Sequence, residues 1–134
     1  MMSGVRAAFI VMSLTASAAL AEPVESGRIV WVTDGDTFRL ESGERIRIAG
    51  IDAAETQPGN AKCRAEIVLG KAATQRAIAL LKNRVVTFER AGRSYDRTVA
   101  RVRLSGRDVA AMLVETGIAQ WWPRGSPKPD WCRR

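Results

Sequence analysis

The feature that most constrains the fold is a run of short strand-like segments early in the chain. Residues 29–32 are apolar, Asp34-Gly35 is a strong turn signal, and residues 37–40 return as a second strand. The segment Arg45-Ile46-Arg47-Ile48 then alternates strictly, so both isoleucines share one face of a strand and both arginines the other. This pattern predicts antiparallel β structure with one buried face and with Arg47 directed outward.

Acidic residues stand at the ends of these segments. Asp36 follows the turn, and Asp52 and Glu55 follow the alternating strand. Two carboxylates can hold a hard cation, a third can act as a base, and the Arg47 guanidinium can bind phosphate. Each residue also has a simpler interpretation when it is taken singly, as part of a hairpin turn or as a solvated loop side chain. The combination favours phosphodiester hydrolysis.

The chain contains no histidine among its 134 residues. This excludes histidine-dependent nucleases, Ser-His-Asp and Cys-His hydrolases, and histidine-ligated zinc sites. An EF-hand loop beginning at Asp34 is also excluded, because its sixth and twelfth positions would be Arg39 and Arg45 instead of glycine and glutamate. The formal net charge of +7 is compatible with a phosphate-bearing partner, although solubility alone also explains a charge of this size.

The first 21 residues are predicted to be a signal peptide. Arg6 supplies positive charge, residues 7–21 carry no charge, and Ala19-Leu20-Ala21 fits the cleavage rule, with Glu22 as the mature N-terminus. The apolar stretch is shorter than the roughly 20 residues that span a membrane, so a retained anchor is the weaker interpretation. We therefore expect residues 22–134 to form one domain of a secreted or periplasmic protein that is not attached to a membrane.

The rest of the chain predicts two helices and two more strands. Residues 64–82 have helical periodicity, with an apolar stripe from Ala65 to Leu80. Residues 85–89 and 98–104 alternate as strands on either side of a polar loop, and Asp108 can cap a short helix that ends near Gly117. The order predicts a mainly β protein: a five-stranded OB-type Greek-key barrel with a helix inserted after strand three and a second short helix near the C-terminus.

Four segments, in this order, resemble the thermonuclease family, also called the micrococcal or staphylococcal nuclease family. They are VTDGDTFRL at residues 32–40, IRIAGIDAAET at 46–56, YDRTVARV at 95–102 and DVAAMLVETGIA at 108–119. The match extends through nearly all of the chain after the predicted signal peptide. The resemblance implies a calcium-dependent nuclease that cleaves DNA, RNA or both through attack by an activated water.

The resemblance also implies roles for individual residues. Two carboxylates and one main-chain carbonyl would bind calcium, a glutamate would be the general base, two arginines would grip the scissile phosphate, and a tyrosine would touch the substrate. The corresponding residues are Asp36, Asp52 and the carbonyl of Ala53 for the metal, Arg47, Glu55 and Arg97 for catalysis, and Tyr95 for substrate contact.

Three positions depart from the family's usual residues. Ala53 replaces threonine but keeps its carbonyl, and Ala54 replaces proline. Asp96 replaces a common glycine directly before Arg97. We expect Asp96 either to pair with Arg97, and so weaken its hold on phosphate, or to require a different loop conformation. The alternative function is a nucleic-acid-binding OB module with impaired catalysis.

The two cysteines, Cys63 and Cys132, are expected to form an intramolecular disulfide in an exported protein, two free thiols being the alternative. The bridge would hold a C-terminal segment whose prolines oppose a helix. Trp121 and Trp122 precede that segment and are interpreted as covering a small core or, less often, as stacking on bases. We expect a monomer that favours single-stranded DNA or RNA.

Overall fold

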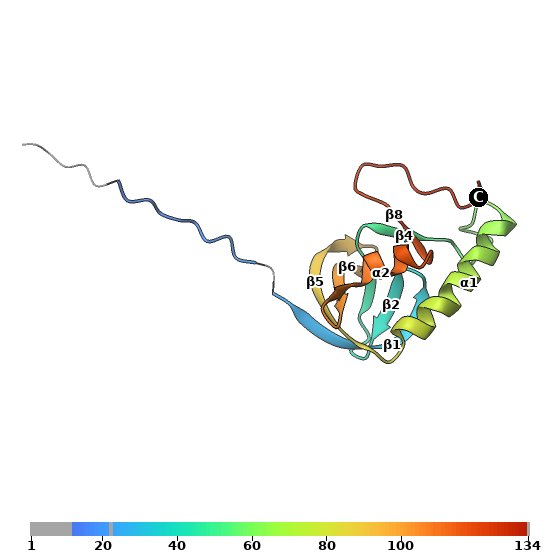
Figure 1. Cartoon of the computed structure of the whole chain (residues 1–134), viewed down its shortest axis with the longest axis horizontal. Coiled ribbons are helices and arrows are strands. Elements are labelled where there is room, and N and C mark those ends of the chain that lie inside the picture. The colour runs from blue at the N-terminus through green and yellow to red at the C-terminus, as the bar shows by residue number, and fades with distance from the viewer. Residues whose placement is uncertain (1–11, 22, 134) are drawn as a thin grey trace, which may run out of the picture.

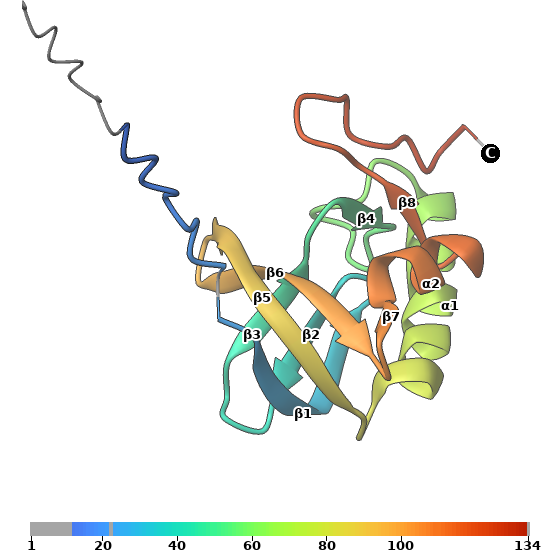
Figure 2. The same cartoon turned by 60° about the vertical axis from the view of Figure 1, so that its left-hand side comes forward.

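A closed barrel of five strands forms the centre of the structure, a computed structural model that describes residues 12–21 and 23–133 (Figures 1 and 2). The strands hydrogen-bond in the order β3-β2-β1-β5-β6, and β3 pairs in parallel with β6 to close the barrel. This arrangement confirms the predicted OB-type barrel. The barrel strands are β1 (Glu25–Asp34), β2 (Thr37–Leu40), β3 (Arg45–Ile48), β5 (Val85–Ser94) and β6 (Arg97–Leu104).

Strand β1 is long enough to pair with two different strands, one along each part of its length. Its first part, residues 25–28, pairs with β5, and its second part, residues 29–34, pairs with β2. Register shifts interrupt the pairing with β2, and such irregularities increase the bend and twist that closure requires. Alternate residues of the strands face inward, so Ile46 and Ile48 of β3 are buried as predicted.

Strand β5 extends further than the sequence predicted. It continues to Ser94 and pairs with β6 up to Arg97, so the predicted polar loop at residues 91–96 is wrong. Only Tyr95 and Asp96 form the turn, and Tyr95 has a positive φ of 56°. The polar residues of this stretch are mostly exposed because both strands extend beyond the barrel core there.

Two helices and three short strands complete the domain. Helix α1 (Arg64–Leu81) lies against the side of the barrel, and helix α2 (Val109–Glu115) follows the two-residue strand β7 (Arg107–Asp108) (Figure 2). Asp108 caps α2, as predicted, by accepting a hydrogen bond from the Ala110 N–H at 3.0 Å. A short strand, β4 (Ile51–Ala53), separates β3 from α1 and pairs with β8 (Ala119–Trp121).

The buried stripe of α1 differs from the predicted one in its first half. Ala73 and Ala77 are buried as expected, but Ala65 and Leu69 are exposed. Glu66 is buried instead, because its carboxylate accepts hydrogen bonds from the N–H groups of Glu55 and Lys62. A polar contact therefore fixes the rotation of the helix start, and hydrophobic periodicity cannot detect such a contact.

The predicted disulfide between Cys63 and Cys132 is present, with the two Cα atoms 6.1 Å apart. It joins the N-cap residue of α1 to the C-terminal segment, which has no helix, as the prolines predicted. The two residues are 69 positions apart, and closing a loop of that length stabilises a fold by about 4 kcal/mol in the chain-entropy model.

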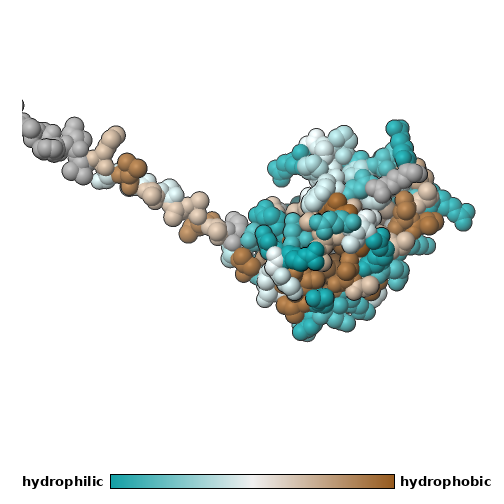
Figure 3. All heavy atoms as spheres, viewed as in Figure 1, coloured by the Kyte–Doolittle hydropathy of each residue, from teal (hydrophilic) through white to brown (hydrophobic). Residues whose placement is uncertain are grey.

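Residues 12–21 form neither helix nor strand and extend away from the barrel (Figures 1 and 3). The side chains of Met12, Leu14 and Leu20 are exposed. The predicted mature N-terminus, Glu22, lies outside the described residues, as do residues 1–11. Within the described part of the chain, no helix combines the length and apolar character needed to cross a membrane.

Gly70 is the point of closest approach between α1 and the segment that follows β4. A Cβ atom added at Gly70 would lie 2.4 Å from the carbonyl oxygen of Glu55 and 2.7 Å from that of Ala54. These oxygens belong to the backbone and cannot move alone. The absence of a side chain at residue 70 therefore sets the position of the Glu55 loop against the helix.

We predict that Gly70→Ala destabilises the protein, although glycine-to-alanine changes inside helices usually stabilise by about 1 kcal/mol. The added methyl group forces the helix away from the loop, and overpacking of this kind costs about 1–3 kcal/mol. Urea denaturation followed by circular dichroism measures the change. Ala72→Gly, at an exposed position of the same helix, calibrates the propensity effect, and a Gly70→Ala variant more stable than the parent contradicts the prediction.

Candidate active site

All seven residues that the sequence singled out line one cleft of about 870 Å³ at one end of the barrel. They come from four places: the β1–β2 turn, strand β3, strand β4 with the loop after it, and the β5–β6 turn. The C-terminal segment adds Trp122 and Lys128 to the lining. Strands β3 and β6 are paired, with Arg47 opposite Val99. This pairing brings the segment around residue 47 close to the segment around residue 97.

Asp36 is a buried carboxylate at the start of β2. Its Oδ2 accepts a hydrogen bond from the Ala53 N–H at 3.0 Å, and its Oδ1 accepts one from the Thr37 hydroxyl at 2.8 Å. Its own N–H donates to Asp34 Oδ1 at 3.0 Å within the tight turn. Gly35 is required in this turn, because a Cβ there would lie 2.8 Å from the Ala53 side chain.

Asp52 is buried on β4, with 2% of its surface exposed. Its Oδ2 accepts a hydrogen bond from the Trp131 indole N–H at 2.9 Å. Its Oδ1 lies 3.9 Å from Arg47 Nη2 and 3.9 Å from Lys128 Nζ. Burial raises the pKa of Asp52, and the nearby Asp36 charge adds to this, while Trp131, Lys128 and Arg47 oppose the shift.

Arg47 is less exposed than predicted, since only 14% of its side chain is accessible to solvent. Its guanidinium donates to the carbonyl oxygens of Ile48 and Ile51, both at 3.1 Å, and lies 3.5 Å from Asp36 Oδ2. The Trp122 ring lies with its centroid 5.8 Å from Arg47 Cζ. Asp36 and Asp52 hold the guanidinium inside the cleft. The alternation of β3 predicts only the face of the strand on which Arg47 lies, and not these contacts.

Arg97 also lines the cleft and has weaker contacts than Arg47. Its donors reach the Ser94 side chain at 3.3 Å and the Thr37 hydroxyl at 3.5 Å. Asp96 does not pair with Arg97. It forms an ion pair with Arg45 at 2.7 Å, and the Arg45 hydrogen bond lowers the pKa of Asp96. The expected restraint of Arg97 by Asp96 is therefore absent among these described residues, and the Arg97 guanidinium contacts neutral oxygens.

Glu55 lies at the edge of the cleft, beside a lysine that the sequence analysis missed. Lys128 Nζ is 3.2 Å from Glu55 Oε1. Burial alone would lower the pKa of Lys128, but the charges of Asp52 and Glu55 outweigh it and raise that pKa. The Glu55 backbone N–H donates to the buried Glu66 carboxylate at 3.3 Å. Both ends of this residue are thus held, one by the C-terminal segment and one by α1.

Asp34 also belongs to this acidic group. Burial and the neighbouring charge of Asp36 raise the pKa of Asp34 to about 7. The charges of Asp36 and Glu55 act in the same direction on this carboxyl. The raised pKa of Asp34 reflects repulsion between neighbouring carboxylates, which is the situation that a bound cation relieves.

The donor set fits a hard divalent cation. Carboxylate and carbonyl oxygens are the ligands that calcium prefers, and it takes about 6–8 of them. Within the described residues, no three acidic or cysteine side chains gather closely enough to hold an ion by themselves. A cation held by Asp36 and Asp52 would therefore also need the Ala53 carbonyl, water or a substrate oxygen.

A comparison with protein families matches residues 45–129 to the staphylococcal nuclease homologue family. The chain belongs to this family. The matched residues run from β3 to the middle of the C-terminal segment, and include Arg47, Asp52, Glu55 and Arg97. A search of curated proteins found no match.

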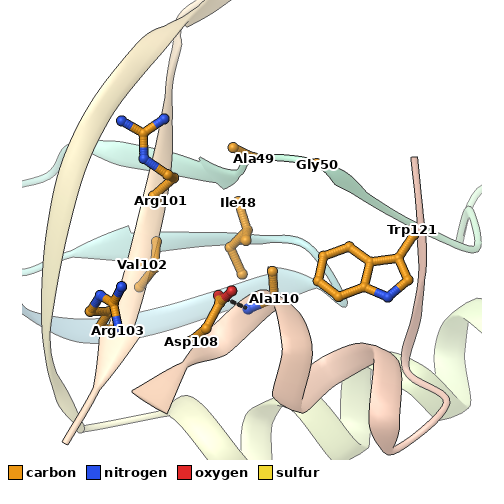
Figure 4. Close-up of a pocket in the computed structure, with 9 residues that line it drawn as sticks. All are labelled: Ile48, Ala49, Gly50, Arg101, Val102, Arg103, Asp108, Ala110 and Trp121. Carbon is orange, nitrogen blue, oxygen red and sulfur yellow. Dashed lines mark hydrogen bonds between the residues drawn. The ribbon is translucent and has the colours of Figure 1, made fainter. Parts of the chain in front are cut away.

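This nuclease homologue has a second, smaller pocket of about 300 Å³ (Figure 4). Trp121 forms one wall of it, and Arg101 and Arg103 of β6 lie on the opposite side. Trp121 is 51% exposed, whereas the next residue, Trp122, lines the main cleft. Two tryptophans adjacent in sequence thus line two different pockets.

We predict that Asp34→Asn stabilises the calcium-free protein at pH 8 and changes its stability much less at pH 5. The folded-state pKa of Asp34 is above the unfolded value, so the folded protein binds more protons between about pH 4 and 7 and loses stability as the pH rises. The asparagine oxygen can still accept the Asp36 N–H. Thermal denaturation with chelator at both pH values measures the effect.

A melting temperature of Asp34→Asn that follows the parent's at every pH contradicts this prediction. Glu41→Gln is the matched control, because Glu41 is an exposed acidic residue that does not line the cleft. Its melting temperature is expected to stay close to the parent's across the same range.

Proposed function

We propose that this protein is a calcium-dependent nuclease that hydrolyses phosphodiester bonds of DNA, RNA or both. The observation that carries the proposal is the convergence of Asp36, Asp52, Glu55, Arg47 and Arg97 in one cleft, from segments up to 61 residues apart. Membership of the nuclease homologue family supports a nucleic-acid substrate. An OB module with impaired catalysis is the competing function, and the experiments below separate the two.

The proposed metal site consists of Asp36, Asp52 and the carbonyl of Ala53. Bound calcium supplies positive charge that polarises the phosphoryl group and offsets the charge of the transition state. Asp36 is held for this task by the Ala53 N–H and the Thr37 hydroxyl, and Asp52 by the Trp131 indole. Because these donors are already in place, little reorganisation is needed when the site fills.

Glu55 is the proposed general base. It stands at the edge of the cleft, where its carboxylate can take the proton of a water that attacks the phosphorus in line with the leaving oxygen. Lys128 holds one of its oxygens, and the Glu66 carboxylate fixes its backbone. The same arrangement holds the Glu55 side chain, which is 29% exposed, in the lining of the cleft.

The two arginines have different proposed roles. Arg97 contacts only neutral oxygens and an aromatic ring, so its guanidinium can turn to a phosphate without breaking an ion pair. Arg47 is held between Asp36 and Asp52. Arg47 would be a better phosphate donor with a cation bound, because the charge of those carboxylates would then be offset. Tyr95 is the proposed substrate contact, and its 92% exposure beside Arg97 supports this role.

Residues 1–21 are proposed to direct export and to be removed, leaving residues 22–134 as a secreted or periplasmic, monomeric nuclease. The exposure of Met12, Leu14 and Leu20 supports this, because a segment that belonged to the domain would bury them. The disulfide agrees with an oxidising compartment.

We predict that Glu55→Gln lowers kcat by about 10²–10⁴-fold, the usual contribution of a general base, and leaves nucleic-acid binding nearly unchanged. Asp36→Ala removes a charged calcium ligand, so cleavage should fall to the level seen with chelator. Digestion of denatured DNA and of RNA with calcium, repeated with a calcium chelator, measures both effects.

Two surface variants serve as controls for that experiment. Arg84→Ala removes an exposed arginine that does not line the cleft. Asp96→Gly removes the partner of Arg45 and leaves Arg97 with its present contacts. Both should cleave at about the parent's rate. A parent protein that binds nucleic acid but shows no calcium-dependent cleavage contradicts the nuclease proposal and establishes the binding module.

The pocket lined by Trp121 is a second proposed contact for a nucleic-acid strand. Trp121 exposes an aromatic face, and Arg101 and Arg103 lie across from it (Figure 4). Base stacking on aromatic side chains and phosphate contacts by arginine are the combination that binds single strands. We therefore include this pocket in the proposed nucleic-acid surface.

We predict that Trp121→Ala weakens binding of single-stranded DNA by about 5- to 150-fold, the equivalent of one lost stacking contact. Affinity should also fall steeply with rising salt because bound arginines release counterions. Fluorescence anisotropy with a labelled oligonucleotide measures both. Trp31→Ala is the matched control, since Trp31 is 60% exposed and lines neither pocket; equal losses in the two variants contradict the prediction.

A further inference from the structure

The C-terminal segment, residues 122–133, crosses over the end of the barrel that holds the cleft and finishes near the start of α1 (Figures 1 and 2). At its beginning, the Trp122 N–H donates to the Gly50 carbonyl at 2.8 Å. At its other end, Cys132 is joined to Cys63. Between these points the segment has no helix and no strand, so its course depends on its two anchors and on a few side chains.

Trp131 is the one buried residue in this segment, with 3% of its surface exposed. Its indole N–H donates to Asp52 Oδ2 at 2.9 Å, across 79 positions of sequence. A carboxylate with one oxygen held in this way cannot rotate freely. The other oxygen, Oδ1, is then left facing the side of the cleft where Arg47 and Lys128 lie.

The segment also places a cation among the carboxylates. Lys128 Nζ lies 3.2 Å from Glu55 Oε1 and 3.9 Å from Asp52 Oδ1. One piece of chain therefore contacts both the proposed base and a proposed metal ligand. Neither contact comes from the barrel, and Trp131 lies beyond the residues that match the family.

The disulfide connects this segment to the support of the Glu55 loop. Cys63 is the N-cap of α1, and its sulfur accepts a hydrogen bond from the Glu66 N–H. The Glu66 carboxylate in turn holds the N–H of Glu55. Cys132 directly follows Trp131, so the same covalent link fixes the tryptophan beside Asp52 and anchors the helix start beneath Glu55.

We propose that Trp131 is a positioning residue for Asp52, and that the Cys63–Cys132 disulfide makes the calcium affinity of the cleft depend on oxidation state. The inference rests on the proposed calcium site. Reduction by a dithiol breaks the sulfur–sulfur bond, adds two electrons and two protons to give two thiols, and converts the dithiol to its own disulfide. The freed segment then no longer holds Trp131 against Asp52.

The first test replaces only the hydrogen-bond donor. Trp131→Phe keeps an aromatic ring in the buried position and removes the indole N–H, so Asp52 Oδ2 loses its partner. Isothermal titration of the oxidised, full-length protein with calcium chloride should show an affinity about 10- to 100-fold weaker, the usual effect of removing a group that orients a metal ligand. Trp31→Phe, the same change at an exposed site, should leave the affinity unchanged.

The second test uses reduction. Titration after treatment with dithiothreitol, and of the Cys63→Ser/Cys132→Ser variant, should show a similar loss of calcium affinity, with the barrel still folded by circular dichroism. Reduction of Trp131→Phe should add little further loss, because the disulfide and the indole act through the same hydrogen bond. If reduction lowered the calcium affinity through a general loss of structure, its effect would add to that of Trp131→Phe.

The outcomes separate this inference from the proposed function. If the parent binds calcium and Trp131→Phe binds it equally well, the inference is overturned while the calcium site stands. If the oxidised parent binds no calcium, the proposed site fails and the inference fails with it. Should the reduced protein unfold, the comparison of Trp131→Phe with Trp31→Phe in the oxidised protein decides the positioning role, and the redox part of the inference is overturned.

Discussion

Closure of the barrel by the parallel pairing of β3 with β6 is the constraint on which the rest of the structure depends. In a sheet left open at this point, β3 and β6 would be free edges, and the residues that precede and follow them would point to separate surfaces. Closure places Arg47 and Arg97 in the lining of one cleft. It also brings Asp96 next to Arg45, which leaves the Arg97 guanidinium without an acidic partner in the described structure.

The compensation of negative charge explains how the side chains of the cleft are arranged. The barrel end concentrates Asp34, Asp36, Asp52 and Glu55, and the mutual repulsion of their charges opposes folding. The protein distributes the compensation over several elements: main-chain N–H groups, a hydroxyl, Arg47, and the Lys128 and Trp131 side chains from the C-terminal segment. These donors come from segments far apart in the sequence, so the compensation depends on the assembled fold.

Local sequence patterns were sufficient for the barrel and for Asp36, Arg47, Asp52 and Glu55 of the cleft, whereas Ala53, Tyr95 and Arg97 were identified from the family resemblance. Alternation identified β3 and β6, the Asp34-Gly35 turn identified the first hairpin, and Asp108 identified the start of α2. The patterns did not predict the features that depend on contacts between segments distant in the sequence. The rotation of α1 depends on a buried Glu66 carboxylate, and the positions of Lys128 and Trp131 depend on a disulfide and on the path of a segment without regular structure. The prolines and the two cysteines predicted a C-terminal segment that has no helix and is anchored by a disulfide. They did not predict which of its side chains line the cleft.

The contact between Trp131 and Asp52 has a consequence for the order of events during synthesis. Asp52 emerges from the ribosome long before Trp131, which follows 79 residues later. The barrel strands and both helices can therefore be complete while the acidic cleft still lacks its indole donor and its tether. If the disulfide holds Trp131 as proposed, a chain without the sulfur–sulfur bond lacks a fixed donor at Asp52. Completion of the proposed catalytic cleft is then coupled to the oxidising compartment to which the chain is proposed to be exported.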